Sequence, residues 1–150
     1  MVSIEVRPYL ESDETAVVGL WREVFSDVPG RNGPQKDIQR KLGVQRELFL
    51  VATSGRELVG TAMAGYDGHR GWVHYLAVHP DHRRQGIGTA LMRSVEERLI
   101  GMGCPKLNLQ VRASNQSVLP FYRRLGYLVE KRISVGKPLR SSDSSASEQT

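Results

Sequence analysis

One seven-residue segment combines the residue types that bind phosphate groups: Arg83-Arg84-Gln85-Gly86-Ile87-Gly88-Thr89. It follows an expected strand and opens an expected amphipathic helix, whose first turn presents unpaired N–H groups and the positive end of the helix dipole. Gly86 and Gly88 have no Cβ, so a pyrophosphate could lie against the backbone. Arg83 and Arg84 supply counter-charge. The spacing favours a phosphate-binding turn over the alternative, a tight turn with solvated arginines.

Two other phosphate-binding motifs are excluded by the sequence. There is no Gly-x4-Gly-Lys-Ser/Thr run, so a P-loop is absent. A dinucleotide fingerprint needs Gly or Ala where Leu91 stands, and it needs a parallel sheet before the turn. The strands that precede this turn are expected to be antiparallel.

A second group of residues, downstream of the turn, points to a known family. Asn115 follows an expected strand, and Phe121-Tyr122 with Leu125-Gly126-Tyr127 close the last expected helix. Arg83 to Gly88 resembles the Q/R-x-x-G-x-G/A signature of the GNAT acyl-CoA N-acyltransferases. The downstream group resembles the second motif of that family at its usual spacing. The two motifs are specific together, and the resemblance runs from about Val2 to Ile133.

The resemblance implies a mixed α+β GNAT fold and gives roles to residues of this chain. Backbone groups of Leu76 to Val78 would pair with the pantetheine arm of acetyl-CoA, the co-substrate, as an added strand does. The N–H groups of the phosphate-binding turn would hold the pyrophosphate. Asn115 would hydrogen-bond the pantetheine or the helix entry, and Tyr122 would donate its phenol proton to the departing thiolate. The implied cofactor-binding residues are Leu76, Ala77, Val78, Arg83, Arg84, Gln85, Gly86, Ile87, Gly88, Thr89 and Asn115.

The chemistry of tyrosine suits the role that the resemblance gives to Tyr122. A thiol has a pKa of about 8.5 and a phenol of about 10, so the phenol is neutral at pH 7 and available as a donor. General acid catalysis typically contributes about 10²–10⁴-fold. The alternative is that Tyr122 is an aromatic core residue at helical spacing.

The residue that deprotonates the acceptor amine is less evident. An amine with a pKa of about 10.4 is mostly protonated at pH 7, so a base or a water relay is expected. Many family members have a glutamate on the fourth strand where this chain has Trp72. Ribosomal-protein N-terminal acetyltransferases have one in an L-E-V-R-x-S-N run, where this chain has Gln110. The substitutes are Asp67, His69, His74 or a water held by the backbone, and these residues form the expected substrate site.

Each substitute also has a structural interpretation. His69 lies in a turn, where histidines are more often solvated than catalytic, and His74 could be a partly buried strand residue. The stretch Gly65 to Gly71, which resembles the uncharacterised YpeA-type members of the family, could be a simple hairpin connection. The loop from Ser26 to Lys36, with Arg31 and Asn32, either lines the acceptor pocket or is an ordinary surface loop.

No metal site is expected, although all four histidines lie between His69 and His82. Strict strand alternation would put His74 and His79 on opposite faces of the sheet. No carboxylate or cysteine stands at a convincing ligand spacing. Cys104 lies beside a helix end and a proline, which favours a structural role over an acyl-enzyme.

Hydrophobic periodicity and chain breakers indicate the elements that must position these residues. The expected strands are Val2–Val6, Leu48–Ala52, Glu57–Tyr66, Trp72–His79, Lys106–Val111 and Tyr127–Val135. The expected helices run from Ser12 or Asp13 to Phe25, around Ile38–Leu42, from Gly86 to Met102 and from about Ser117 to Leu125. The strands before the long helix form an antiparallel meander, and the strand–helix–strand crossover sets its two strands parallel.

Composition sets the wider limits. A chain of 150 residues fits one domain, expected over residues 1–136, with a neutral Ser-rich tail at 137–150 that is expected to be disordered. The apolar runs are far too short to span a membrane. The sequence shows no secretory signal and contains a single cysteine, and together these favour a cytoplasmic protein. The net charge of +5 attracts anions, but with only 7% aromatic residues a nucleic-acid binder is disfavoured.

The sequence therefore predicts an N-acetyltransferase that moves an acetyl group directly from acetyl-CoA to a primary amine of a small molecule or peptide. Tyr122 is the expected general acid, and the protein is expected to be a monomer or a homodimer. The alternative is a non-catalytic acyl-CoA-binding sensor on the same fold, which would keep the phosphate-binding turn without depending on Tyr122.

Overall fold

The computed structural model describes residues 3–25 and 33–139 of the chain. Its strands are β1 (Ile4–Pro8), β2 (Phe49–Ser54), β3 (Glu57–Tyr66), β4 (Gly71–Val78) and β5 (Leu107–Leu109). Its α-helices are α1 (Glu14–Val24), α2 (Gly33–Leu42), α3 (Ile87–Gly101) and α4 (Leu119–Arg124). Short 3-10 helices lie at Glu11–Asp13, Arg46–Leu48, Pro80–His82 and Ala113–Val118.

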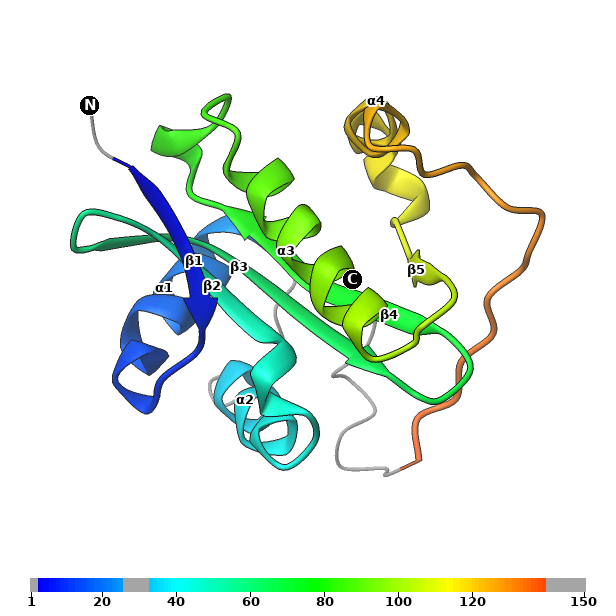
Figure 1. The fold of residues 1–150 in the computed structure, drawn as a ribbon, viewed down its shortest axis with the longest axis horizontal. Helices are drawn as coiled ribbons and strands as arrows, with labels where there is room; N and C mark the ends of the chain where they lie inside the picture. The colour runs from blue at the N-terminus through cyan, green and yellow to red at the C-terminus, as the bar shows by residue number, and fades with distance from the viewer. Residues whose placement is uncertain (1–2, 26–32, 140–150) are drawn as a thin grey trace.

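The five strands form one sheet in the order β1-β2-β3-β4-β5 (Figure 1). The pairs from β1 to β4 are antiparallel, and β4 pairs with β5 in parallel. Two parts of the expected topology are thereby confirmed: the antiparallel meander, and the crossover through α3 that sets its two strands parallel.

Each face of the sheet has its own apolar core. Leu50 and Ala52 of β2 point to the face that α3 covers with five buried residues, whereas Phe49 and Val51 point to the face of α1 and α2. The buried residues of α3 are Ile87, Leu91, Met92, Val95 and Leu99. Alternation along the strand and helical spacing along α3 therefore build a three-layer domain around the sheet.

The first helices differ in detail from the sequence prediction. Asp13 stands at the start of α1, but its carboxylate accepts from the Leu10 N–H at 2.8 Å and pairs with Arg7 instead of capping α1. Helix α2 begins at Gly33, so residues 33–36 are helical rather than part of a loop. Pro34 fits there because the first helical turn needs no proline N–H. Arg31 and Asn32 lie outside the described residues.

The expected last strand, Tyr127 to Val135, is wrong, because these residues belong to no strand of the structure. Side chains tie the segment to the neighbourhood of β5: Asn108 donates to Glu130 at 2.8 Å, and Gln110 donates to Ser134 at 2.6 Å. Four apolar residues of the segment are exposed: Leu128, Val129, Ile133 and Val135. The alternating pattern favours a strand, but a strand also needs a backbone edge in register, and β5 is only three residues long.

The far end of the chain is described only in part. Residues 137–139 are exposed, and the rest of the expected tail, 140–150, lies outside the described residues. Within residues 3–25 and 33–139, the structure contains no helix that is both long and apolar enough to cross a membrane.

Candidate active site

An extra residue in β4 shapes the centre of the site. Met63 of β3 pairs with His74, but Thr61 pairs with Ala77, so two residues of β4 stand opposite one of β3. Tyr75, inside this bulge, has a left-handed φ of 53°. A bulge bends its strand and re-aims the side chains around it. Here it lets the consecutive residues His74 and Tyr75 line the same hollow.

The bulge also marks where β4 and β5 separate. Their parallel register covers Gly71 to Val73 opposite Leu107 to Leu109, and β4 continues to Val78 beyond it. Leu76 to Val78, the segment expected to pair with pantetheine, lies in this continuation. The structure therefore places the expected backbone segment at a strand edge that has left its parallel neighbour.

Contacts with α1 and α2 hold the bulge in its strained conformation. The Trp21 ring stacks on Tyr75 with centroids 3.8 Å apart, and its Nε1 donates to the Thr61 hydroxyl at 2.9 Å. That hydroxyl donates in turn to the Tyr75 carbonyl at 2.8 Å, and the Tyr75 phenol donates to Asp37 at 2.6 Å. Burial, and then the bond to Asp37, raise the pKa of Tyr75. A non-glycine residue keeps a left-handed backbone conformation where several contacts hold it there, as the contacts of Tyr75 do.

The phosphate-binding turn lies between the end of β4 and the start of α3. Arg84 has a φ of 64° and Gly86 a φ of 80°, and α3 begins at Ile87. The Gly86 carbonyl accepts the first helical bond from the Ala90 N–H at 2.9 Å. Nothing lies within 4 Å of the position that a Cβ on Gly86 would occupy. Arg83, Arg84 and Gln85 are exposed, so the turn presents backbone N–H groups and cationic side chains to the same solvent.

Gly88 has a neighbour that the sequence did not suggest. A Cβ on Gly88 would lie 3.1 Å from Cζ of Phe121, so the missing side chain makes room for α4. This contact seats α4 against the first turn of α3. It thereby joins the two motifs of the sequence in space, although Phe121 follows Gly88 by 33 positions in the sequence.

Tyr122 lies on α4 and packs half-buried against the α3 core. Its ring meets Phe121 edge-on at 5.0 Å and Tyr127 at 6.0 Å. Burial raises the pKa of Tyr122 to about 12, so the phenol keeps its proton throughout the neutral range. The Tyr127 phenol donates to Glu96 of α3 at 2.6 Å, which fixes the chain just after α4.

Asn115 lies in the connection from β5 to α4. Its backbone is non-helical, with φ −121° and ψ 39°, inside the 3-10 helix Ala113–Val118. Its N–H donates to the Arg112 carbonyl at 2.8 Å, and the residue is exposed. Asn115 therefore stands at the helix entry, one of the two places that the resemblance implies for it.

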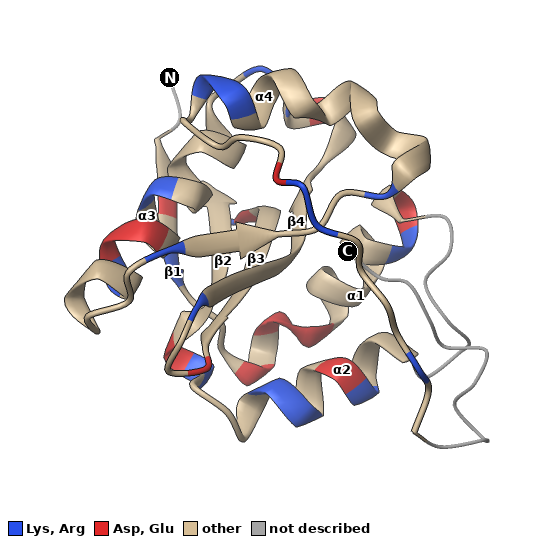
Figure 2. Ribbon diagram, turned by 90° about the vertical axis from the view of Figure 1, so that its right-hand side faces the viewer, with Lys and Arg blue, Asp and Glu red and all other residues tan. Residues whose placement is uncertain are grey.

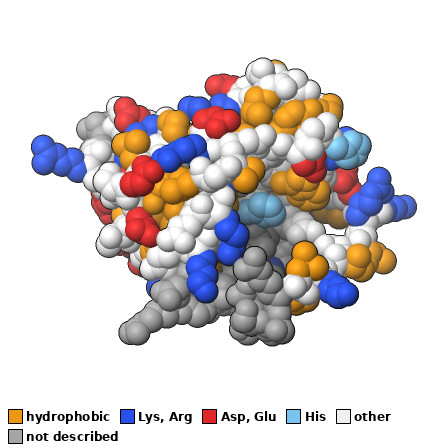
Figure 3. All heavy atoms as spheres, turned by 90° about the horizontal axis from the view of Figure 1, so that it is seen from below, with side chains coloured by type: hydrophobic (Ala, Val, Ile, Leu, Met, Phe, Trp, Pro, Cys, Tyr) orange, Lys and Arg blue, Asp and Glu red, His pale blue; other side chains and the backbone are white. Residues whose placement is uncertain are grey.

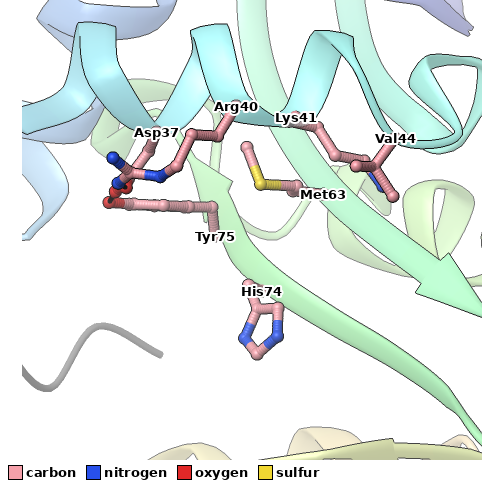
Figure 4. A pocket seen from close by; sticks show the side chains of 7 residues that line it. All are labelled: Asp37, Arg40, Lys41, Val44, Met63, His74 and Tyr75. Carbon is pink, nitrogen blue, oxygen red and sulfur yellow. Dashed lines mark hydrogen bonds and ion pairs between the residues drawn. The ribbon is translucent and has the colours of Figure 1, made fainter. Parts of the chain in front are cut away.

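A hollow of about 380 Å³ opens beside the bulge, between α2 and the sheet. Figure 3 shows a histidine set back among basic side chains on this face of the molecule. Asp37, Arg40 and Tyr75 converge at one end, Lys41 and Val44 lie at the other, and Met63 lies between them (Figure 4). The described residues that line it are Asp37, Arg40, Lys41, Val44, Met63, His74 and Tyr75.

Of the three substrate residues expected from the sequence, His74 alone lines the hollow. His74 is an exposed residue of β4. Partial loss of solvent where its ring lines the hollow, and then the nearby positive charge of Lys41, lower the pKa of His74, against a smaller opposite effect of Asp37. Because an unperturbed histidine has a pKa of about 6.5, a lowered value leaves the ring neutral at pH 7. His74 can therefore accept a proton there.

Asp67 and His69 lie elsewhere, in the β3–β4 hairpin turn. Asp67 Oδ1 accepts from the N–H groups of His69 and Arg70, both at 2.8 Å. These two backbone bonds are the main causes that lower the pKa of the Asp67 carboxyl. A carboxylate so engaged is a turn-forming group and a poor base, and His69 is exposed beside it.

The bulge overturns one expectation about the other histidines. His79 Nε2 lies 3.6 Å from Glu23 of α1, which puts His79 on the same side of the sheet as His74, not on the opposite side. His82 lies 3.3 Å from Glu57. Among the described residues no group of three His, Cys, Asp or Glu side chains could hold a metal ion.

The sequence reasoning missed the residues that α2 contributes to the hollow, Asp37, Arg40 and Lys41. Figure 2 shows Lys/Arg and Asp/Glu positions side by side along α2. In the sequence they look like the solvated face of a short helix with one apolar stripe. Only the packing of α2 beside β4 turns that face toward a site.

Comparison with known proteins agrees with this geometry. The profile of the acetyltransferase (GNAT) family matches residues 13–127. An acetyltransferase of Yersinia enterocolitica is 45% identical over 136 residues, which are 91% of this chain and 96% of that protein. A Yersinia pestis protein, named an uncharacterised N-acetyltransferase, is 44% identical over 136 residues, which are again 91% of this chain and 96% of that protein.

Solved structures show the same fold. An aminoglycoside N-acetyltransferase in complex with CoA superposes with a TM-score of 0.77 at 16% identity, covering 93% of this chain and 97% of that one. The ribosomal-protein-S18-alanine N-acetyltransferase of Escherichia coli gives a TM-score of 0.69 at 24% identity, covering 83% of this chain and 77% of that one. The expected mixed α+β GNAT fold is confirmed.

Proposed function

The chain belongs to the acetyltransferase (GNAT) family, and from this we propose that it transfers an acetyl group directly from acetyl-CoA to a primary amine bound in the hollow beside β4. Tyr122 acts as the general acid and His74 as the general base. The observation that carries this assignment is the bulge at Tyr75. It opens the edge of β4 on one side and turns His74 into the hollow on the other.

The residues present fit a pantetheine pyrophosphate. The N–H groups from Arg84 to Thr89 would hold the pyrophosphate, because Gly86 leaves its backbone open and the start of α3 favours negative charge. Leu76 to Val78 would pair with the pantetheine arm along the edge that β5 leaves. Asn115 would close the far side of this channel from the helix entry. Acetyl-CoA supplies an activated acetyl group.

The two protein groups then divide the proton transfers. His74, neutral at pH 7, takes a proton from the bound ammonium, and the freed amine forms the new C–N bond to the acetyl carbon as the C–S bond breaks. Tyr122 gives its proton to the leaving sulfur. The nitrogen releases its second proton to water as the amide forms, and solvent then returns a proton to Tyr122 and takes one from His74. The two pKa shifts keep His74 neutral and Tyr122 protonated at pH 7, which are the protonation states that the two roles need, and they also make His74 a weaker base and Tyr122 a weaker acid.

Replacing the Tyr122 phenol distinguishes an enzyme from the alternative function, a non-catalytic acyl-CoA-binding sensor on the same fold. For Tyr122→Phe we expect kcat to fall by about 10²-fold or more, because the leaving thiolate loses its proton donor. The affinity for acetyl-CoA should change little, since the ring and its packing remain. Release of CoA thiol measures turnover, and ligand-induced thermal shift measures binding. Unchanged turnover would remove Tyr122 from the mechanism, and a chain without amine-dependent turnover in either form would be a sensor.

A further inference from the structure

The charges of the hollow do not balance. Asp37 is engaged at both carboxylate oxygens, one in an ion pair with Arg40 and the other as acceptor of the Tyr75 phenol at 2.6 Å. Asp37 is the only acidic residue among the described residues that line the hollow, and its charge is thus offset within the protein at one end.

Lys41 supplies the remaining positive charge, at the other end of the hollow (Figure 4). Its Nζ donates to the carbonyl of Ala64. Among the ion pairs of the described residues Lys41 takes part in none. Burial is the main cause that lowers its pKa, and the negative charge of Glu47, which forms no ion pair with Lys41 and is not among the described lining residues, opposes that effect. A partly buried ammonium that forms no ion pair is stabilised by an anion that reaches it from the hollow.

Lys41 and the proposed base line the same hollow. Ala64, which accepts from Lys41, follows Met63, and Met63 is the cross-strand partner of His74. The positive charge of Lys41 acts on His74, so the two groups lie within electrostatic range of each other. One small molecule can therefore place an amine near His74 and an anion near Lys41.

We propose that the acceptor is a small amino acid, whose carboxylate binds Lys41 while its primary amine faces His74. This deepens the proposed function and rests on it, because the amine must reach the acetyl group beside β4. Lys41 is then a specificity-determining residue that recognises the acceptor without taking part in proton transfer. Polyamines, which carry no anion, fit the hollow poorly.

Matched pairs of acceptors test this directly. The probes are 3-aminopropanoic and 4-aminobutanoic acid, each compared with its own amide, and spermidine as a polyamine, with acetyl-CoA as donor. We expect kcat/KM to favour at least one acid over its amide by about tenfold or more, mainly through KM, because a charge-assisted hydrogen bond is lost in the amide. An amide or spermidine that serves as well as the best acid would overturn the proposal.

Variants of α2 show whether Lys41 is responsible. Lys41→Met should abolish the preference, so that each acid and its amide give similar kcat/KM, while the acetyl-CoA thermal shift stays near the native value. Lys41→Arg keeps the charge and should retain the preference. A loss seen in Lys41→Met but not in Lys41→Arg would therefore come from the missing charge and not from misfolding at position 41. Lys36→Met removes an exposed charge of the same helix outside the hollow and should change nothing. A preference that survives Lys41→Met contradicts the inference alone, whereas failure of every amine to release thiol contradicts the proposed function beneath it.

Discussion

His74 owes its place in the hollow to the inserted residue of β4, and its expected protonation state gives a sharp kinetic test. The pKa of His74 is lowered by partial loss of solvent and by Lys41, so kcat/KM should fall only as the pH drops below the ordinary histidine value of about 6.5. For His74→Gln we expect kcat/KM to fall by about 10²-fold or more at pH 7. The deficit should shrink toward pH 10, because solution then supplies the free amine.

The comparison variant is His69→Gln, in the exposed hairpin turn outside the hollow. It should keep both the rate and the pH profile of the native enzyme. A pH-independent loss in His74→Gln would indicate a packing role for His74, and a loss confined to His69→Gln would move the base to the hairpin.

At the scale of elements, the joint between α3 and α4 depends on the absence of one methyl group. Gly88→Ala places a Cβ 3.1 Å from the Phe121 ring and must displace that ring or α4. Alanine favours a helix over glycine by up to about 1 kcal/mol, so the clash has to exceed this gain to destabilise the protein. We expect Gly88→Ala to lower the free energy of unfolding, measured in urea. Because Tyr122 is a residue of α4 and moves with that helix, we also expect the variant to lower kcat by a larger factor than it raises KM.

Gly101→Ala separates helix propensity from the contact. Gly101 lies in the same helix with nothing within 4 Å of its added Cβ, so this variant should be stabilised by about 0.5–1 kcal/mol. Equal stabilisation of both variants would show that the joint tolerates the methyl group. Adding Phe121→Leu to Gly88→Ala should restore stability in part, since neighbouring changes are not additive.

The sequence predicts those elements whose signals are local. The bounds of Glu57–Tyr66 match β3, and the glycines and arginines before α3 mark its turn, because strand alternation and helix starts are encoded within a few residues. The bulge at Tyr75 has no such signal, since an inserted residue is visible only against its partner strand. Segment Tyr127–Val135 fails for the same reason: its pattern is that of a strand, but pairing depends on the edge beside it.

In the candidate site, too, the parts with local sequence signals could be predicted and the parts that depend on packing could not. The turn and the Tyr122 motif were predictable, whereas the acceptor hollow was not, because Lys41 and Asp37 come from a helix 33 to 37 residues before His74 and meet it only through packing. For Gly88 the sequence predicts contact with a phosphate group, and that stays a prediction; the structure adds that its missing Cβ makes room for an aromatic ring of a distant helix.

At the scale of the whole molecule, binding of acetyl-CoA should couple both halves of the fold, since the proposed cofactor residues come from the edge of β4, the turn before α3 and the entry to α4. A ligand at about 100 times its Kd adds about 2.7 kcal/mol to the free energy of unfolding. For a chain of this length, about 2–4 °C per kcal/mol gives a Tm rise of about 5–11 °C. We expect this rise with acetyl-CoA in a thermal unfolding experiment.

ATP separates recognition from charge in that experiment. The chain carries a net charge of +5, so any polyphosphate could raise the Tm to some extent through electrostatic attraction alone. ATP has the phosphates but no pantetheine arm to pair with Leu76 to Val78, so its shift should be small and should vanish as salt is added. The acetyl-CoA shift should persist in salt, because strand-like pairing and burial of the arm are screened little. Equal shifts for the two ligands would place binding at the arginines alone and remove the β4 edge from the site.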